Sequence, residues 1–136
     1  MLAGAVVATS MVLAGTAVLN GAVFQVASVG DANLNHALYD IANDLFFAAG
    51  FGFAAFFAGA GIAITLTRAL PSAMATAAYI VAVLSVVSGV GFFAKSGFFA
   101  IGGAFGFIGP VLSLLWVLWA SVVMLRATPT TPPAAA

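Results

Sequence analysis

The sequence feature that most constrains the fold is an uncharged apolar stretch, Leu45 to Thr67, with the sequence LFFAAGFGFAAFFAGAGIAITLT. As an α-helix, its residues up to Leu66 would reach about 33 Å, enough to cross a hydrocarbon core of about 30 Å. Each leucine, isoleucine and phenylalanine favours insertion by about 0.3 to 0.6 kcal/mol, and no charged side chain opposes them. The stretch therefore predicts a membrane-spanning helix.

The composition supports the same class of protein. The chain is 65% hydrophobic and 4% charged, whereas soluble domains carry about 25% charged residues. Three basic and three acidic side chains give a formal charge of zero, so there is no basic surface for nucleic acid. Cysteine is absent, which excludes disulfides and thiolate metal sites. The expected partner is the lipid bilayer, and no nucleic acid.

Four apolar segments of spanning length predict an all-α fold, an integral membrane protein built as an antiparallel four-helix transmembrane bundle. The first segment lacks the basic leader and the cleavage pattern of a secretory signal, so it should remain as a span. The tail is rich in Pro, Thr and Ala without apolar periodicity, and we expect it to be disordered. The expected spans are about 2–27, 41–67, 72–94 and 104–126, with the tail at 127–136.

The connections between spans carry recognisable helix signals. Gly30 can end the first helix, and Asp31 can cap the next by accepting hydrogen bonds from its first turn. The apolar repeat that follows predicts an amphipathic approach running straight into the second span, with Tyr39 at the membrane interface. After Arg68, Pro71 cannot continue a helix and Ser72 can cap the third span, so the second and third spans should be antiparallel neighbours.

Small side chains recur at helical spacing on two spans. Such stripes let helix backbones approach closely in a membrane, so we expect these two to pack together. The second span also carries a stripe of bulky side chains, which we expect to make ordinary packing and lipid contacts and not to form a ligand groove. We interpret the Gly-x-Gly pairs at 50–52 and 59–61 as packing glycines. The small stripes are Gly50, Ala54, Ala58, Gly61 and Thr65, and Ala78, Ala82, Ser85 and Gly89; the bulky stripe is Phe46, Phe53, Phe57 and Ile64.

Five polar residues are expected to gather at one membrane surface: His36, Asp40, Asn43, Asp44 and Lys95. His36 and Asp40, one helical turn apart, can pair, and Lys95 can offer Asp44 a counter-charge. Interface anchoring with an ion pair is favoured over a proton or ion role, and metal binding ranks last. At the opposite surface we expect Trp116 and Trp119.

Asn20 is the polar residue expected inside the membrane. It shares a helical face with Thr9 and Thr16, and its amide should point into the bundle and form an interhelical hydrogen bond. A substrate contact is the less favoured alternative.

The basic residues next to the spans predict the orientation. Four crossings place Arg68 and Arg126 on one side, and Lys95 on the other. Because the side with more arginine and lysine usually faces the cytoplasm, we expect a multi-pass protein of the cell membrane with both termini cytoplasmic.

The segment ALYDIANDLFFAAGFGFAAFFAGAGIAITLTRALP, together with the C-terminal LLWVLWASVVMLR, resembles uncharacterised small bacterial integral membrane proteins. In these proteins a span ends in an Arg-x-x-Pro turn and the last span holds tryptophan before a basic residue. The resemblance covers about two thirds of the chain and implies a multi-span membrane protein, without implying an activity.

Two functions remain open. The favoured one is a non-catalytic structural or interaction subunit, able to form a homo-oligomer or bind another membrane protein. The alternative is a small transporter or channel component that uses the polar patch at the outer surface, although no span carries the deep carboxylate that small proton-coupled exporters use. An enzyme is not expected, because the lone His36 has no nucleophile near it in sequence. No motif implies a cofactor or a metal.

Overall fold

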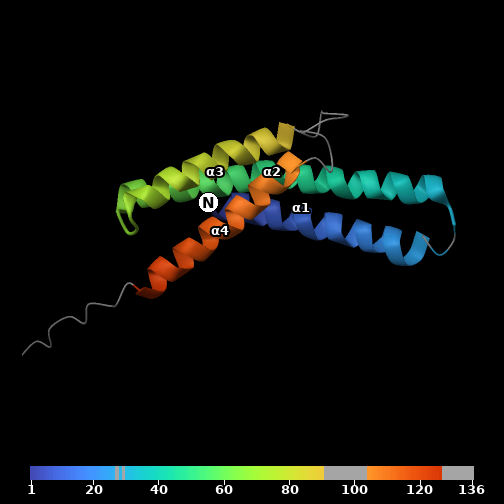
Figure 1. Cartoon of the computed structure of the whole chain (residues 1–136), viewed down its shortest axis with the longest axis horizontal. Coiled ribbons are helices and arrows are strands. Elements are labelled where there is room, and N and C mark those ends of the chain that lie inside the picture. Colours follow the sequence, from blue (N-terminus) through green and yellow to red (C-terminus); the bar gives the residue numbers. More distant parts are fainter. Residues whose placement is uncertain (27, 29, 91–103, 127–136) are drawn as a thin grey trace, which may run out of the picture.

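The computed structural model describes the chain except for residues 27, 29, 91–103 and 127–136. The expected tail and Lys95 therefore lie outside the described residues. The described part forms four α-helices and one short π-helical turn, without strands: α1 (Leu2–Gly21), η1 (Ala22–Val26), α2 (Ala32–Thr67), α3 (Ser72–Val90) and α4 (Ala104–Arg126) (Figure 1). All four α-helices are long and apolar enough to cross a membrane. The all-helical prediction is confirmed for the described residues.

The start of α2 follows the predicted capping signal. The Asp31 carboxylate accepts hydrogen bonds from the backbone N–H groups of Asn33 and Leu34, at 3.1 and 3.0 Å, and Gly30 takes a left-handed conformation just before it, with φ of 79°. From there α2 continues unbroken to Thr67, so the amphipathic approach and the second span are one helix, as predicted. Over 36 residues this helix is about 54 Å long, longer than a hydrocarbon core.

The turn between α2 and α3 is tight but differs in one detail from the prediction. Arg68 ends α2 in the left-handed conformation, with φ of 52°, and its N–H donates to the Ile64 carbonyl at 2.8 Å. Ser72 is already the first residue of α3, so it does not occupy the capping position. Pro71 precedes the helix instead, where its fixed φ suits a helix start and its missing N–H costs nothing.

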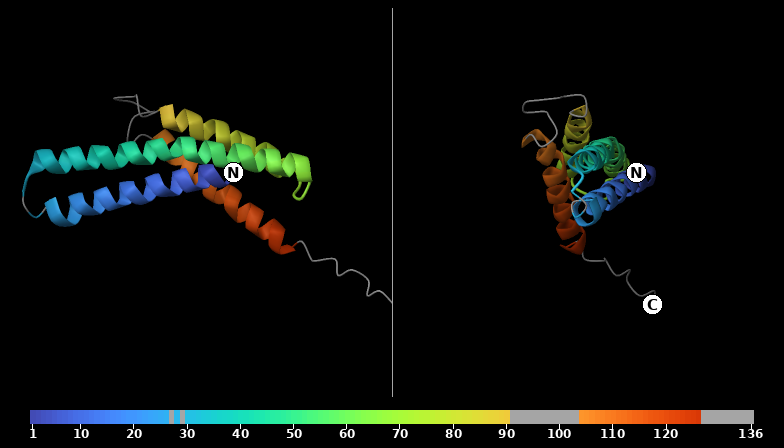
Figure 2. Two further views of the ribbon diagram at one scale, coloured as in Figure 1. Left: turned by 180° about the vertical axis from the view of Figure 1, so that it is seen from behind. Right: turned by 90° about the vertical axis from the view of Figure 1, so that its right-hand side faces the viewer.

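The central helix is α2, which packs against α1 on one face and α3 on another (Figures 1 and 2). An added Cβ on Gly52 would lie 2.6 Å from the backbone nitrogen of Ala8 in α1. An added Cβ on Gly50 would lie 2.9 Å from the backbone oxygen of Ser85 in α3. The two glycines are about 200° apart around the helix, since each residue turns it by about 100°. The two short distances confirm that Gly50 and Gly52 are packing glycines and that the predicted stripes of α2 and α3 meet.

The contact with α1 uses a stripe that the sequence analysis did not identify. Gly4, Ala8 and Gly15 are buried, at positions i, i+4 and i+11 of α1, so they share one helical face. A Cβ on Gly4 would meet the backbone nitrogen of Phe56 at 2.5 Å. The first two helices are therefore in direct backbone contact.

The helices α1 and α3 are displaced from each other along α2. Met1 lies beside Gly59 of α2, whereas α3 begins immediately after the turn that follows Thr67. The start of α1 is thus about 12 Å short of the end of α2, from the rise per residue. In both side views α1 extends toward the start of α2, while α3 covers the other half (Figures 1 and 2).

Gly52→Ala should destabilise the α1–α2 pair, because its Cβ meets backbone that cannot rotate away. Overpacking of this kind costs about 1 to 3 kcal/mol. Gly21→Ala is the matched control, since nothing lies within 4 Å of its added Cβ, and it should be neutral or slightly stabilising. Thermal unfolding in detergent measures both, and equal unfolding temperatures would contradict the observed backbone contact.

Candidate functional site

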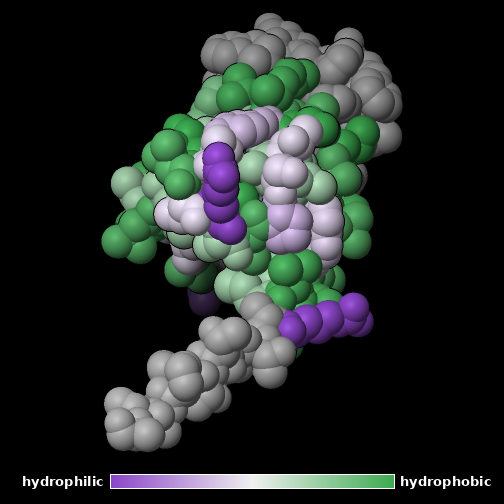
Figure 3. Space-filling view, turned by 90° about the vertical axis from the view of Figure 1, so that its left-hand side faces the viewer, coloured by the Kyte–Doolittle hydropathy of each residue, from purple (hydrophilic) through white to green (hydrophobic). Residues whose placement is uncertain are grey.

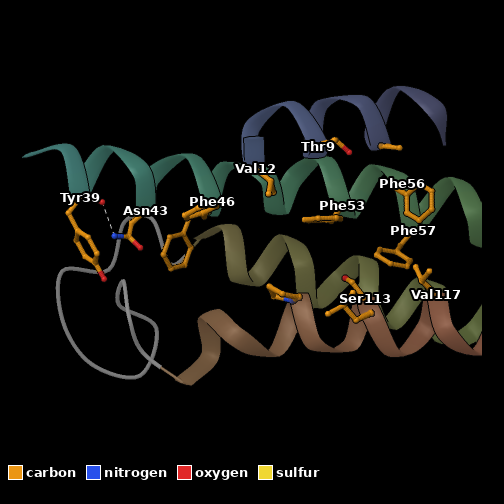
Figure 4. A pocket seen from close by; sticks show the side chains of 14 residues that line it. Thr9, Val12, Tyr39, Asn43, Phe46, Phe53, Phe56, Phe57, Ser113 and Val117 are labelled. Atoms are coloured by element: carbon orange, nitrogen blue, oxygen red, sulfur yellow. Dashed lines mark hydrogen bonds between the residues drawn. The ribbon is translucent and has the colours of Figure 1, made fainter. Parts of the chain in front are cut away.

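A groove of about 680 Å³ lies between α1, α2 and α4 (Figure 4). Its floor is α2, and the close-up shows α1 and α4 on opposite sides of it. We call it the phenylalanine groove, because five of its lining residues are phenylalanines: Phe46, Phe47, Phe53, Phe56 and Phe57. The remaining lining residues are Ala5, Thr9, Val12, Tyr39, Asn43, Pro110, Ser113, Leu114 and Val117.

The floor of the groove is polar at one end and apolar along the rest of its length. Tyr39, Asn43, Phe46, Phe53 and Phe57 recur at i, i+4, i+7, i+14 and i+18, so they lie on one face of α2. The first two are polar, and the rest are aromatic hydrocarbon. Most of the bulky stripe, for which the sequence favoured packing and lipid contact, thus faces a cavity. Within that stripe, Phe57 and Ile64 are also part of the buried core.

The α4 wall is held by Trp116. Its indole N–H donates to the Met74 carbonyl of α3 at 3.0 Å, and its ring meets Phe57 edge-on with centroids 5.3 Å apart. The residue is only 8% exposed, so Trp116 is a packing residue of the interior and not the interfacial anchor that the sequence suggested. Trp119, at 42% exposure, remains at the surface.

A second, smaller cavity of about 80 Å³ lies between α2, α3 and α4. Ser85 and Ser88 are among its lining residues, and within the described residues the Ser85 hydroxyl oxygen is buried without a hydrogen-bond partner. Ser113 differs, because it donates to the Gly109 carbonyl at 2.8 Å. The volume is sufficient for a water molecule, which would satisfy the Ser85 hydroxyl.

The polar patch predicted at one surface is partly assembled. The His36 Nδ1 lies 3.0 Å from the Asp40 Oδ2, as predicted, and both side chains are exposed. The Asn43 amide donates to the Tyr39 carbonyl of its own helix at 2.8 Å. Asp44 is half-buried, and its pairing with Lys95 stays a prediction because Lys95 lies outside the described residues. In the part of the chain that is described, no three His, Asp or Glu side chains come together as a metal site would require.

Asn20 is not inside the bundle. It is exposed on α1, so the expectation that its amide points inward is wrong for this chain in isolation. The reason is that α1 buries its small face, with Gly4, Ala8 and Gly15, and that face excludes position 20. Of the two threonines grouped with it, Thr16 donates to the Val12 carbonyl of its own helix at 2.8 Å, and Thr9 lines the phenylalanine groove.

Trp116→Phe should loosen α4 and widen the phenylalanine groove, because it keeps the ring against Phe57 but removes the donor to Met74. Loss of one buried hydrogen bond costs about 0.5 to 1.5 kcal/mol. Trp119→Phe is the control, and should change stability by less than about 0.5 kcal/mol as a surface substitution. Thermal unfolding in detergent compares them, and an equal effect of both variants would show that the Met74 bond contributes nothing.

Comparisons with protein-family models, curated proteins and solved structures found no match to this chain. What the candidate site can bind is therefore inferred from its own residues. These residues form an apolar groove that ends in a phenol and an amide, with the exposed His36–Asp40 contact on the same helix. Such a site is suited to binding apolar or amphipathic molecules.

Proposed function

We propose that this chain is a multi-pass protein of the cell membrane that acts as a non-catalytic structural or interaction subunit. The observation that carries the proposal is the chemistry of its interior. Among the described residues, the only buried polar side chains are Ser85, Ser88 and Ser113, and none of them is a strong acid or base. Ionisable groups inside a membrane typically mark ion pathways and proton relays, so an interior of serine hydroxyls and apolar side chains favours a structural role.

The positions of the charged groups support the membrane placement. Arg68 follows α2 and Arg126 ends α4, and both elements end on the same side of the molecule (Figures 1 and 2). A view onto that end shows hydrophilic residues at separate places on a largely hydrophobic surface (Figure 3). The acidic residues and His36 belong to the opposite end, at and after the start of α2. Such separation fits a protein whose polar ends lie in the two headgroup layers.

The outward faces of the helices are suited to bulky contacts with a partner or with lipid, and not to close backbone contact through glycine. The small stripes of α1, α2 and α3 are already occupied by one another. The helix α4 instead exposes large apolar side chains, among them Leu118 and Leu125, each at 62% or more. A second subunit would therefore meet α4 through bulky side chains, as in van der Waals packing without a small-residue motif.

Reconstitution into liposomes tests the non-catalytic, non-transporting role. Vesicles that contain the protein should show the same proton and cation leak as empty vesicles, measured with a pH-sensitive dye and with a potential-sensitive dye. A flux that the wild type supports and Asp44→Asn abolishes would contradict the proposal and favour a transporter, because Asp44 is the acidic residue nearest to the apolar part of α2.

The orientation has a separate test. The excess of arginine at the end with Arg68 and Arg126 places that end in the cytoplasm under the positive-inside rule. A reporter enzyme that is active only outside the cytoplasm should therefore be inactive when fused after Arg126, and active when inserted at Gly30. The opposite pattern would reverse the orientation.

A further inference from the structure

We propose that the phenylalanine groove is a binding site for one acyl chain of a membrane phospholipid, with the phospholipid headgroup beside Tyr39 and Asn43. This goes beyond the proposed role as a subunit and uses its membrane placement. The groove has about 680 Å³ of space, and its walls come from α1 and α4, which pack mainly on α2 and α3 respectively. In a bilayer, the medium that reaches such an opening is lipid.

The lining of the groove matches an amphipathic molecule in the order of its parts. The Tyr39 hydroxyl and the Asn43 amide lie at one end (Figure 4), where they can donate hydrogen bonds to ester or phosphate oxygens. From Asn43 to Phe57 the floor extends about 21 Å along α2. One leaflet is about 15 Å deep, half of the hydrocarbon core. The groove is therefore long enough for a chain that spans its own leaflet.

The polar end of the groove also lies at the membrane depth that a phospholipid headgroup would occupy. The His36–Asp40 pair, with side chains 79% and 52% exposed, lies at the level of this polar end: His36 is one turn before Tyr39, and Asp40 lies between Tyr39 and Asn43 along α2. Exposed polar and acidic side chains are stable in the headgroup region and costly in hydrocarbon. The groove thus starts next to the headgroup layer and runs into the apolar layer.

A second copy of the chain fits the groove less well than an acyl chain. Helices associate closely in membranes through small residues, but the floor of this groove is made of phenylalanine rings. The glycines of α2 that permit backbone approach, Gly50 and Gly52, face α3 and α1. A flexible hydrocarbon chain can adapt to the spaces between rings, whereas a helix backbone would be held away from them.

The test uses the full chain in phosphatidylcholine nanodiscs that contain a small fraction of phosphatidylcholine with a photoreactive diazirine on one acyl chain. After illumination, mass spectrometry locates the labelled residues. We expect labels to be concentrated on the groove residues Phe46 and Phe53, several-fold above Ile80 and Val83, which are exposed apolar residues of α3 outside the groove. Uniform labelling of exposed apolar residues would overturn the proposal.

Groove-filling variants provide the matched comparison. Thr9→Phe adds a ring inside the groove, and Ser10→Phe adds the same ring at an exposed neighbouring position outside its lining. Thr9→Phe should reduce groove labelling several-fold, and Ser10→Phe should leave it unchanged. Val117→Phe, from the opposite wall, should repeat the loss, so the result does not depend on one variant folding.

Two other outcomes would also overturn the proposal. Crosslinks between two copies at groove residues would assign the groove to a second subunit. Labelling of the outer helix faces without the groove would reject the lipid site while leaving the membrane-embedded subunit role intact. A chain that does not enter the nanodisc would instead reject the membrane placement on which both proposals depend.

Discussion

The close approach of three backbones at α2 is the constraint on which the rest of the structure depends. Gly52 brings α2 against the backbone of α1, and Gly50 brings it against the backbone of α3. In a membrane the hydrophobic effect does not drive helices together, so packing at short distance must supply the attraction. The Gly-x-Gly spacing puts the two contacts on nearly opposite sides of one helix, because two residues turn it by about 200°.

The same arrangement explains why a groove exists. With its small faces committed to α1 and α3, α2 has only its phenylalanine face left for α4. Bulky rings keep a fourth helix at a distance, and α4 is held mainly through Trp116, which reaches the Met74 carbonyl and the Phe57 ring. The helix therefore contacts α2 at a few large side chains and packs more extensively on α3. The space left over on the α1 side is the groove.

Local signals in the sequence predicted much of the fold. The Asp31 cap, the turn after Arg68 and the facing stripes of α2 and α3 depend on neighbouring residues or on helical periodicity. The structure confirms them, except that Ser72 begins α3 and does not cap it. The α1 stripe followed the same rule, since Gly4, Ala8 and Gly15 have helical spacing, and the same search on α1 would have found it. Asn20 was placed wrongly because polarity was used to choose the buried face, although close packing of small residues decided it.

The groove could not be predicted in the same way, because it depends on where helices distant in sequence come to lie. A stripe of Phe46, Phe53 and Phe57 has the same pattern whether it packs on a helix, contacts lipid or lines a cavity. The difference is made by the position of α4, which rests on a hydrogen bond between residues 42 positions apart. Periodicity describes one helix at a time, so it identifies the face but not its neighbour. Here α4 touches Phe57 through Trp116 but stands far enough from Phe46 and Phe53 to leave them partly exposed between α1 and α4.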